Sequence, residues 1–256
     1  MTNTKITITE DIPTTLAEEV VAFSKSVEEF TFLATGGHQA TACYPTLRGY
    51  FESQASHGQI VIGDERLVPL ASTWSNTAML FDLFDEAKGA LSLSSPVLPL
   101  EGELAKIEEI MGDESVNLQD KTSTILDSYS ALLRQVVANY DRIISKSPKT
   151  MFVHLGLGPD GHIASLFPNR SDLGISGKYS QISVDLDQNN KMLRTSVTFD
   201  TLNSAEVVVV SASGSLKGEL IARALNNDYS IPLAHLSPKQ LIFVVDQEAG
   251  DAISGS

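Results

Sequence analysis

The stretch MFVHLGLGPDGHIASLFP, residues 151–168, decides the fold class of this 256-residue chain. Its first five residues form a continuous run with only His154 polar, which is typical of a strand buried on both faces of a parallel sheet. The glycine-rich segment after it leaves the carboxyl end of that strand, where open α/β sheets bind ligands. We predict further strands of this sheet at residues 31–34, 60–62, 207–210 and 241–245.

Helical patterns lie between these runs. Capping-box spacing starts a predicted helix at Thr15 that runs to about Val27, and Ser75-Asn76 starts another. Two more helices are predicted near 121–140 and 215–225. Strands that alternate with helices indicate an α/β fold with a mainly parallel sheet, and we expect one domain over residues 1–256.

Two intervals interrupt the alternation. Residues 170–194 are rich in Gly, Ser, Asp and Asn, and we expect short strands there, such as 181–184, in a small flanking β layer. Residues 98–120 carry turn signals at Glu101-Gly102 and Met111-Gly112-Asp113, so we predict a loop-rich segment.

The composition limits the classes of partner. Lys and Arg number 18 against 32 Asp and Glu, a formal net charge of −14, which argues against nucleic-acid binding. An anionic small molecule meets the same repulsion, so its site must gather cations and backbone N–H groups locally. Each basic residue near a predicted loop is therefore informative.

The chain is expected to be a cytoplasmic protein without a membrane segment. No apolar run approaches the roughly 20 residues that span a bilayer, and no secretory signal is visible at the start. Cys43 is the single cysteine, which excludes an intrachain disulfide. The histidines lack partners at metal-ligand spacing, so we predict no metal.

Gly156, Gly158 and Gly161 match the spacing of a dinucleotide-binding fingerprint. That fingerprint also requires a helix after the third glycine and an acidic residue about 20 positions on. The chain instead continues through Phe167-Pro168 into a polar, glycine-containing region. We therefore predict no nicotinamide site and no cofactor.

Taken together, residues 156–168 strongly resemble the signature of the 6-phosphogluconolactonase family, which is grouped with the glucosamine-6-phosphate isomerases (deaminases). Similar motifs follow the family order over nearly the whole chain: Gly63-Asp64-Glu65-Arg66-Leu67-Val68-Pro69, Ser75-Asn76, Arg194 to Ala205, and Gly214-Ser215-Leu216-Lys217. The resemblance implies a Rossmann-like three-layer α/β/α fold. It also implies hydrolysis of 6-phospho-D-glucono-1,5-lactone to 6-phospho-D-gluconate, a step of the oxidative pentose phosphate pathway.

The resemblance suggests catalytic roles at three positions. His162 is expected to take a proton from the attacking water, and Asp160 to orient its imidazole. Arg66 is the candidate for contacts to the carbonyl or ring oxygens of the substrate. Asp64 lies where the deaminases have their base, and we count it among the substrate-binding residues. The alternatives are a capping histidine, an Asx-turn aspartate and a surface arginine.

The phosphate of the substrate is expected to bind Arg194, Lys217 and the loop after the first predicted strand. The family has Ser-Gly-Gly-Ser/Arg-Thr-Pro in that loop, whereas this chain has Thr35-Gly36-Gly37-His38-Gln39-Ala40. The backbone N–H groups of Gly36 and Gly37 can still hold phosphate, and His38 and Gln39 can donate hydrogen bonds. The changed loop could shift affinity or substrate preference.

Two other functions stay open at this point. A deaminase or sugar-phosphate isomerase is disfavoured, because Phe167 replaces the glutamate that assists ring opening and Arg66 replaces an aromatic residue. A non-catalytic sugar-phosphate-binding protein would fit the altered loop. The oligomeric state, monomer or homodimer, is not visible in the sequence.

Overall fold

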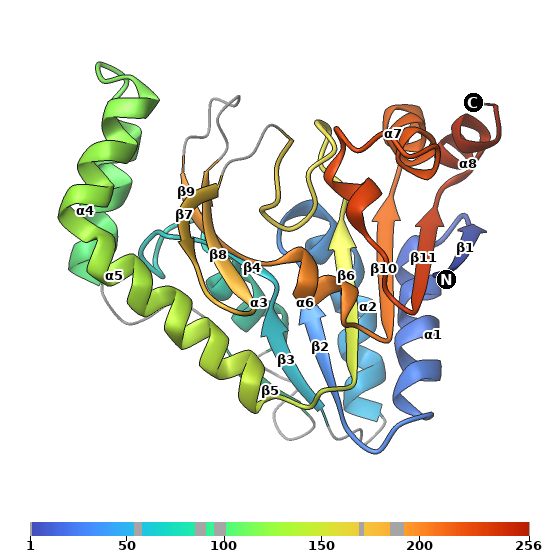
Figure 1. Cartoon of the computed structure of the whole chain (residues 1–256). Coiled ribbons are helices and arrows are strands. Elements are labelled where there is room, and N and C mark those ends of the chain that lie inside the picture. Colours follow the sequence, from blue (N-terminus) through green and yellow to red (C-terminus); the bar gives the residue numbers. More distant parts are fainter. Residues whose placement is uncertain are drawn as a thin grey trace.

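The structure is a computed structural model that describes residues 2–53, 58–84, 91–94, 101–168, 172–184 and 192–255. Its larger sheet is parallel throughout and has the strand order β1-β11-β10-β6-β2-β3-β5. In that order the strands are Asn3–Ile8, Gln240–Val245, Val207–Ala212, Met151–Gly156, Phe30–Ala34, Gly58–Ile62 and Leu91–Ser94. Figure 1 shows helices against both faces of this sheet.

Side-chain alternation along the strands separates two apolar layers. Phe32, Phe152 and Val209 point to the face covered by helices α1 (Ile12–Ser24), α2 (Gly37–Ser53) and α3 (Asn76–Phe84). Leu33, Val153 and Val210 point to the opposite face. That face packs on α5 (Leu118–Lys146), α6 (Phe199–Asn203), α7 (Ser215–Leu225) and α8 (Gln247–Ser254). Both faces are buried under helices, which explains why the predicted strands are continuously apolar.

A second, antiparallel sheet forms the flanking layer. Its order is β4 (Asp64–Arg66), β9 (Leu193–Val197), β8 (Ser180–Val184) and β7 (Asp172–Ser176). It packs on α4 (Glu101–Gly112) and α5 through a separate apolar cluster that includes Ile107, Val136 and Ile182. Figure 1 shows this sheet between the main sheet and the α4–α5 pair. The predicted three-layer α/β fold with a small β layer is thus confirmed, and the single-domain assignment stays a prediction.

All five predicted strands are confirmed, as is the strand at 181–184. The predicted start of the first helix is wrong, because Asp11 rather than Thr15 caps it, accepting a 3.0 Å hydrogen bond from the Thr14 backbone N–H. The predicted loop is wrong over Glu101–Gly112, which is helical; its two glycines lie at the ends of α4, where they interrupt little. Residues 98–100 lie outside the described residues.

The sequence reading missed β1 and α8. The edge strand β1 is mostly exposed, so it lacks the continuous apolar pattern of the inner strands. The helix α8 has eight residues and begins after Asp246, whose carboxylate accepts a 2.9 Å hydrogen bond from the Ala249 backbone N–H. Short capped helices of this kind give little periodicity to detect.

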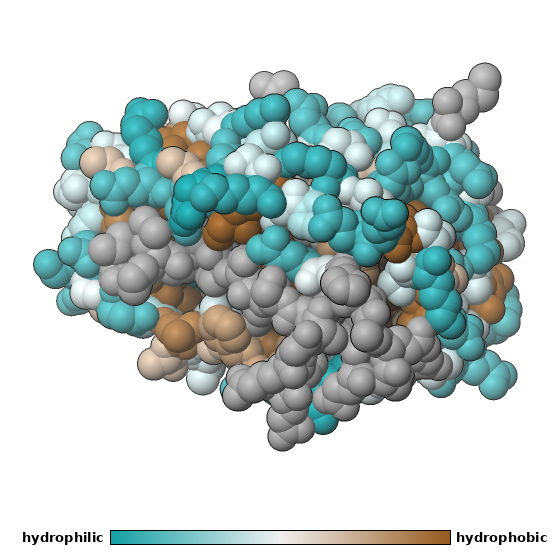
Figure 2. Space-filling view, turned by 90° about the horizontal axis from the view of Figure 1, so that it is seen from below, coloured by the Kyte–Doolittle hydropathy of each residue, from teal (hydrophilic) through white to brown (hydrophobic). Residues whose placement is uncertain are grey.

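The amino termini of the parallel strands lie at one end of the molecule and their carboxyl termini at the other. Figure 2 looks at the end with the amino termini, where the described residues are mostly hydrophilic with scattered hydrophobic groups. Among the described residues, no helix is both long and apolar enough to cross a membrane. The opposite end, where the strands reach their carboxyl termini, is the place to look for a site.

The contact between α7 and α8 predicts the effect of a single methyl group. A Cβ at Gly218 of α7 would overlap the Ala249 carbonyl of α8, whereas a Cβ at Gly102 of α4 would meet no atom within 4 Å. We expect Gly218→Ala to lower the free energy of unfolding by about 1–3 kcal/mol through overpacking. Gly102→Ala should leave it unchanged or raise it by up to about 1 kcal/mol. Urea titration of both variants measures the difference, and equal stabilities would contradict the close packing of α7 on α8.

Candidate active site

A pocket lies where the strand order of the main sheet changes direction. From β2 the chain proceeds to β3 and β5 on one side, and from β6 it proceeds to β10 and β11 on the other. The loops after β2 and β6 therefore diverge, which opens the crevice that ligands occupy in such sheets. The pocket is lined by residues from both loops and by side chains from β4, α3 and α7: Thr35, Gly36, Gly37, His38, Gln39, Asp64, Arg66, Asn76, Gly156, Leu157, Gly158, Pro159, His162, Ala164 and Lys217.

The glycine-rich turn after β6 is shaped to hold His162. Gly161 has a φ of +92°, a left-handed conformation that side chains rarely adopt. A Cβ at Gly158 would overlap the His162 imidazole, so only glycine fits there. The Gly158 backbone N–H donates a 2.8 Å hydrogen bond to the His162 carbonyl, which closes the turn.

Asp160 orients the His162 ring. Asp160 Oδ1 lies 2.5 Å from His162 Nδ1 and also accepts the His162 backbone N–H at 3.3 Å. Although burial raises the pKa of Asp160, the hydrogen bonds and charge interaction with His162 outweigh it, and the pKa is lowered. Asp160 is therefore a carboxylate at neutral pH and accepts from Nδ1–H. The lone pair of the neutral ring is then on Nε2.

Phe167 packs on the same imidazole. The ring centroids of Phe167 and His162 are 4.9 Å apart at an interplanar angle of 45°, and the Arg194 guanidinium lies 5.2 Å from the Phe167 centroid. The residue beside the histidine is thus an apolar ring and cannot transfer a proton.

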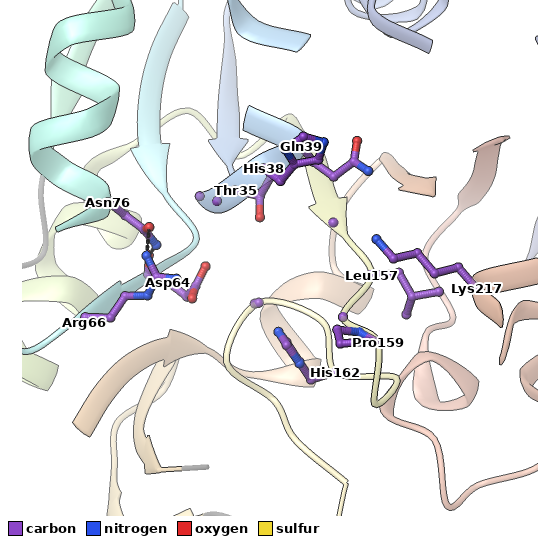
Figure 3. Close-up of a pocket in the computed structure, with 15 residues that line it drawn as sticks. Thr35, His38, Gln39, Asp64, Arg66, Asn76, Leu157, Pro159, His162 and Lys217 are labelled. Atoms are coloured by element: carbon purple, nitrogen blue, oxygen red, sulfur yellow. Dashed lines mark hydrogen bonds between the residues drawn. The ribbon is translucent and has the colours of Figure 1, made fainter. Parts of the chain in front are cut away.

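Arg66, Asp64 and Asn76 lie together on one side of the pocket, as Figure 3 shows. The Asn76 side chain donates to the Asp64 backbone carbonyl at 2.8 Å and accepts from the Arg66 guanidinium, which also donates to the Trp74 carbonyl at 3.1 Å. The Asp64 carboxylate is buried and accepts the Ser165 hydroxyl at 2.7 Å. These contacts fix one cation and one carboxylate at the pocket edge.

Glu65 holds β4 and the start of α3 together on this side of the pocket. Its carboxylate is buried and accepts the backbone N–H groups of Arg66 and Asn76 at 2.7 Å and that of Thr77 at 2.5 Å. It therefore binds the first turn of α3 to β4, where a negative charge also suits the helix dipole. Burial raises the pKa of Glu65, and these hydrogen bonds offset only part of the rise.

The other side of the pocket favours an anion. The α2 N-terminus contributes Gly37, His38 and Gln39, and Gly37 turns the chain into the helix with a φ of +71°. Lys217 lies in the first turn of α7, which no side chain caps. Burial lowers the pKa of Lys217, and Asp246 partly offsets the effect. Free N–H groups at two helix N-termini and one ammonium group suit a phosphate.

The structure brings most of the predicted site residues together. Eight line the pocket: Gly36, Gly37, His38, Gln39, Asp64, Arg66, His162 and Lys217. Asp160 lies behind His162, and Arg194 is opposite Arg66 in the β4–β9 pair and over Phe167 rather than in the lining. The prediction that Arg194 binds phosphate with Lys217 is not tested by this geometry.

Asn76 and Thr35 also line the pocket, although the sequence predicted no role for either of them. Asn76 was visible only as part of the helix start Ser75-Asn76, and a Cβ at Gly36 would overlap its amide. The described residues hold no group of three or more His, Cys, Asp or Glu side chains that could bind a metal ion.

Comparisons with known proteins agree with this arrangement. The family model described as glucosamine-6-phosphate isomerases/6-phosphogluconolactonase matches residues 3–245. Probable 6-phosphogluconolactonase 4 of Arabidopsis thaliana is 28% identical over 256 residues, which cover 98% of this chain and 92% of that protein. The chloroplastic 6-phosphogluconolactonase 3 of the same plant is 29% identical over 195 residues, 74% of this chain but only about half, 54%, of the relative.

A solved structure shares the fold. The 6-phosphogluconolactonase of Trypanosoma brucei superimposes with a TM-score of 0.72 over 98% of each chain, at 19% sequence identity. At that identity the likeness concerns the arrangement of the backbone.

The buried Glu65 carboxylate predicts a pH-dependent stability. Its pKa in the folded state is raised above the ordinary 4.5, so its contribution to stability is present below that pH and is lost as the pH rises through the raised pKa. Glu65→Gln removes this ionisation but sets an amide against N–H donors, at a cost of about 1–3 kcal/mol at low pH. We expect the stability deficit of the variant to shrink as the pH rises from about 4.5 through the raised pKa of Glu65.

Urea titrations across that range measure this deficit. Glu109→Gln, an exposed substitution on α4, serves as the control and should follow the wild-type pH profile. A deficit for Glu65→Gln that stays constant with pH would contradict the raised pKa.

Proposed function

Because this chain belongs to the glucosamine-6-phosphate isomerase/6-phosphogluconolactonase family, we propose that it hydrolyses 6-phospho-D-glucono-1,5-lactone to 6-phospho-D-gluconate. The observation that carries the proposal is the Asp160-bound imidazole of His162 between two differently charged sides of one pocket (Figure 3). The distinction from the deaminase branch rests on Phe167, whose ring occupies the space beside His162 where that chemistry needs an acid.

His162 acts as the general base. Its Nε2 takes a proton from water while the water oxygen bonds to C1 of the lactone. Asp160 holds the ring in the tautomer that leaves Nε2 free and stabilises the imidazolium that forms. The tetrahedral intermediate then collapses with cleavage of the bond from C1 to the ring oxygen. The imidazolium returns its proton to that oxygen, which becomes the C5 hydroxyl of the product.

Negative charge develops on the carbonyl oxygen during the attack. Arg66 is the cation on that side of the pocket, held by Asn76 and the Trp74 carbonyl, and we assign it to the carbonyl or ring oxygens. The Asp64 carboxylate suits a sugar hydroxyl, which can donate to it. Both groups are held by neighbours before substrate binds, so the reaction needs little reorganisation.

The phosphate binds at the opposite side. We assign to it Lys217 and the side chains of His38 and Gln39, with the N–H groups of Gly36 and Gly37 in the loop that leads from the Asn76 side of the pocket to them. Arg194 lies over Phe167 and is opposite Arg66 in the β4–β9 pair, so its assignment to the phosphate rests on the family resemblance. The local cations and N–H donors offset the repulsion of an anionic substrate by a chain with a net charge of −14.

We also propose that the protein acts in the cytoplasm, with no nucleic-acid partner, as a monomer or homodimer. The buried single cysteine, whose pKa burial raises to about 11, suits a reducing compartment without requiring one. A relative named as chloroplastic is the reason to test the location directly, for example with a tagged full-length chain.

The role of His162 predicts a loss of turnover without a loss of binding. We expect His162→Ala to lower kcat by roughly 10²–10⁴-fold, the usual value of a general base. Product binding should change little. The measurement is the initial rate with freshly prepared lactone near neutral pH and low temperature, corrected for spontaneous opening, together with calorimetry of 6-phosphogluconate.

His235→Ala, which removes an exposed histidine outside the pocket, is the matched control and should keep the wild-type rate. If the wild-type protein binds 6-phosphogluconate but opens the lactone no faster than His162→Ala, the protein is a sugar-phosphate-binding protein and the enzyme hypothesis is wrong.

The role of Lys217 predicts selectivity for phosphorylated substrate. Lys217→Met should lower kcat/KM for the phosphorylated lactone roughly 10–100-fold, the range for a lost charge-assisted hydrogen bond. The rate with unphosphorylated D-glucono-1,5-lactone should stay within about twofold of wild type, because that substrate lacks the phosphate that Lys217 binds. Since burial opposes the charged form of Lys217, the variant should unfold at no lower temperature than wild type.

Lys239→Met removes an exposed lysine paired with Glu206 and is the control. Arg194→Met in the same assay tests whether Arg194 also binds the phosphate. Equal losses on both substrates in Lys217→Met would remove Lys217 from the phosphate site.

A further inference from the structure

A chain of buried hydrogen bonds runs beneath the phosphate side of the pocket. The Thr35 backbone N–H donates to the Tyr44 hydroxyl at 2.8 Å, and that oxygen lies 2.9 Å from His154 Nδ1. His154 Nε2 lies 2.8 Å from the Ser211 hydroxyl, which is 3.1 Å from Gln39 Oε1. Tyr44, His154 and Ser211 have no exposed surface.

These residues come from three elements that the sheet register brings together. His154 is on β6 and Ser211 on β10, where the paired residues are Val209 with His154 and Ser211 with Gly156. Both side chains point to the face covered by α2, which carries Tyr44 and Gln39. The chain of hydrogen bonds thus ties together the two ends of the loop from Thr35 to Gln39.

The donors and acceptors along these hydrogen bonds can be arranged in only one direction. A backbone N–H is a fixed donor, so Tyr44 accepts from Thr35 and gives its own proton to His154 Nδ1. Burial lowers the pKa of His154 to about 3, so the ring carries one proton, on Nε2. Nε2–H donates to Ser211, whose proton goes to Gln39 Oε1. In the reverse direction the Tyr44 hydroxyl would accept from both Thr35 and His154, and neither contact would accept its proton.

We propose that Tyr44, His154 and Ser211 are positioning residues whose hydrogen-bond relay holds Gln39 with its amide NH₂ turned to the anion side of the pocket. Gln39 lines the pocket together with Lys217, and Figure 3 shows its amide nitrogen on the side nearer to that lysine. Because the oxygen is directed to Ser211, the amide presents its donor end to a ligand. A carboxamide fixed in this way selects an anionic oxygen over a donor and loses little rotamer freedom on binding.

The inference rests on the proposed function in one respect, the identity of the anion as the phosphate of the substrate. Its test is therefore a binding measurement, with calorimetry of 6-phosphogluconate and of gluconate, in addition to KM and kcat. Gln39→Ala should weaken 6-phosphogluconate binding roughly tenfold and raise KM for the lactone correspondingly. A reversed amide would present oxygen to the phosphate, so unchanged or tighter binding by Gln39→Ala would overturn the proposal.

Ser211 supplies the test of the relay itself. Ser211→Ala should weaken 6-phosphogluconate binding roughly three- to tenfold, because Gln39 then samples both amide orientations. Ser211→Cys retains the size of the side chain but is a weak donor, so it should resemble alanine if the hydroxyl proton matters and wild type if packing does. Ser180→Ala removes another buried serine hydroxyl, on β8, and should lose stability without loss of binding.

A double-mutant cycle completes the design. In a Gln39→Ala background, Ser211→Ala should cause no further loss of binding, since the residue through which it acts is gone. Independent, multiplicative losses would show that Ser211 acts on the fold and not through Gln39. If the protein does not hydrolyse the lactone but the two substitutions still show this coupling in 6-phosphogluconate binding, the proposed function is wrong and the hydrogen-bond relay is supported.

Discussion

The parallel register of β2, β6 and β10 is the constraint on which the site depends. It aligns the carboxyl ends of these strands, so that Thr35, Gly156 and Ser211 come close although they are far apart in the sequence. Because the connections from β2 and β6 run to opposite edges of the sheet, the loops that follow these two strands diverge and leave a crevice between them. The small antiparallel sheet then brings Asp64 and Arg66 to the open side. A shift of one residue in this register would turn His154 to the opposite face of the sheet.

The two sides of the pocket carry different charges. Arg66 lies on β4 with the carboxylates of Asp64 and Glu65, whereas Lys217 lies in the first turn of α7, which no side chain caps. A ligand with a neutral ester at one end and an anion at the other matches this asymmetry. The acidic surface keeps the field outside the pocket unfavourable for polyanions, so the selection of a small anion is a local property.

The sequence predicted those features that follow from short-range spacing. Asp160 and His162 are two residues apart in a tight turn, so their contact was foreseeable, as were the inner strands with their continuous apolar runs. Glu65 was recognised only as part of a motif, because its partners lie 11 and 12 residues ahead and depend on how α3 meets β4. The relay joins residues 39, 154 and 211, which no spacing relates. From the sequence, His154 could be interpreted only as a histidine packed in the core or as one that supports the site from behind.

The relay also gives a physical meaning to the altered loop between β2 and α2. A hydroxyl at position 39 could rotate to suit any partner, whereas a carboxamide has a donor end and an acceptor end and must be oriented to favour an anion. Gln39 would thus bring a risk of presenting its oxygen to phosphate. The hydrogen bonds of Ser211, His154 and Tyr44 fix the amide orientation, which requires three buried polar side chains, each of them hydrogen-bonded. On this argument the residues at 39, 154 and 211 are one functional unit, and a change at one of them is felt at the other two.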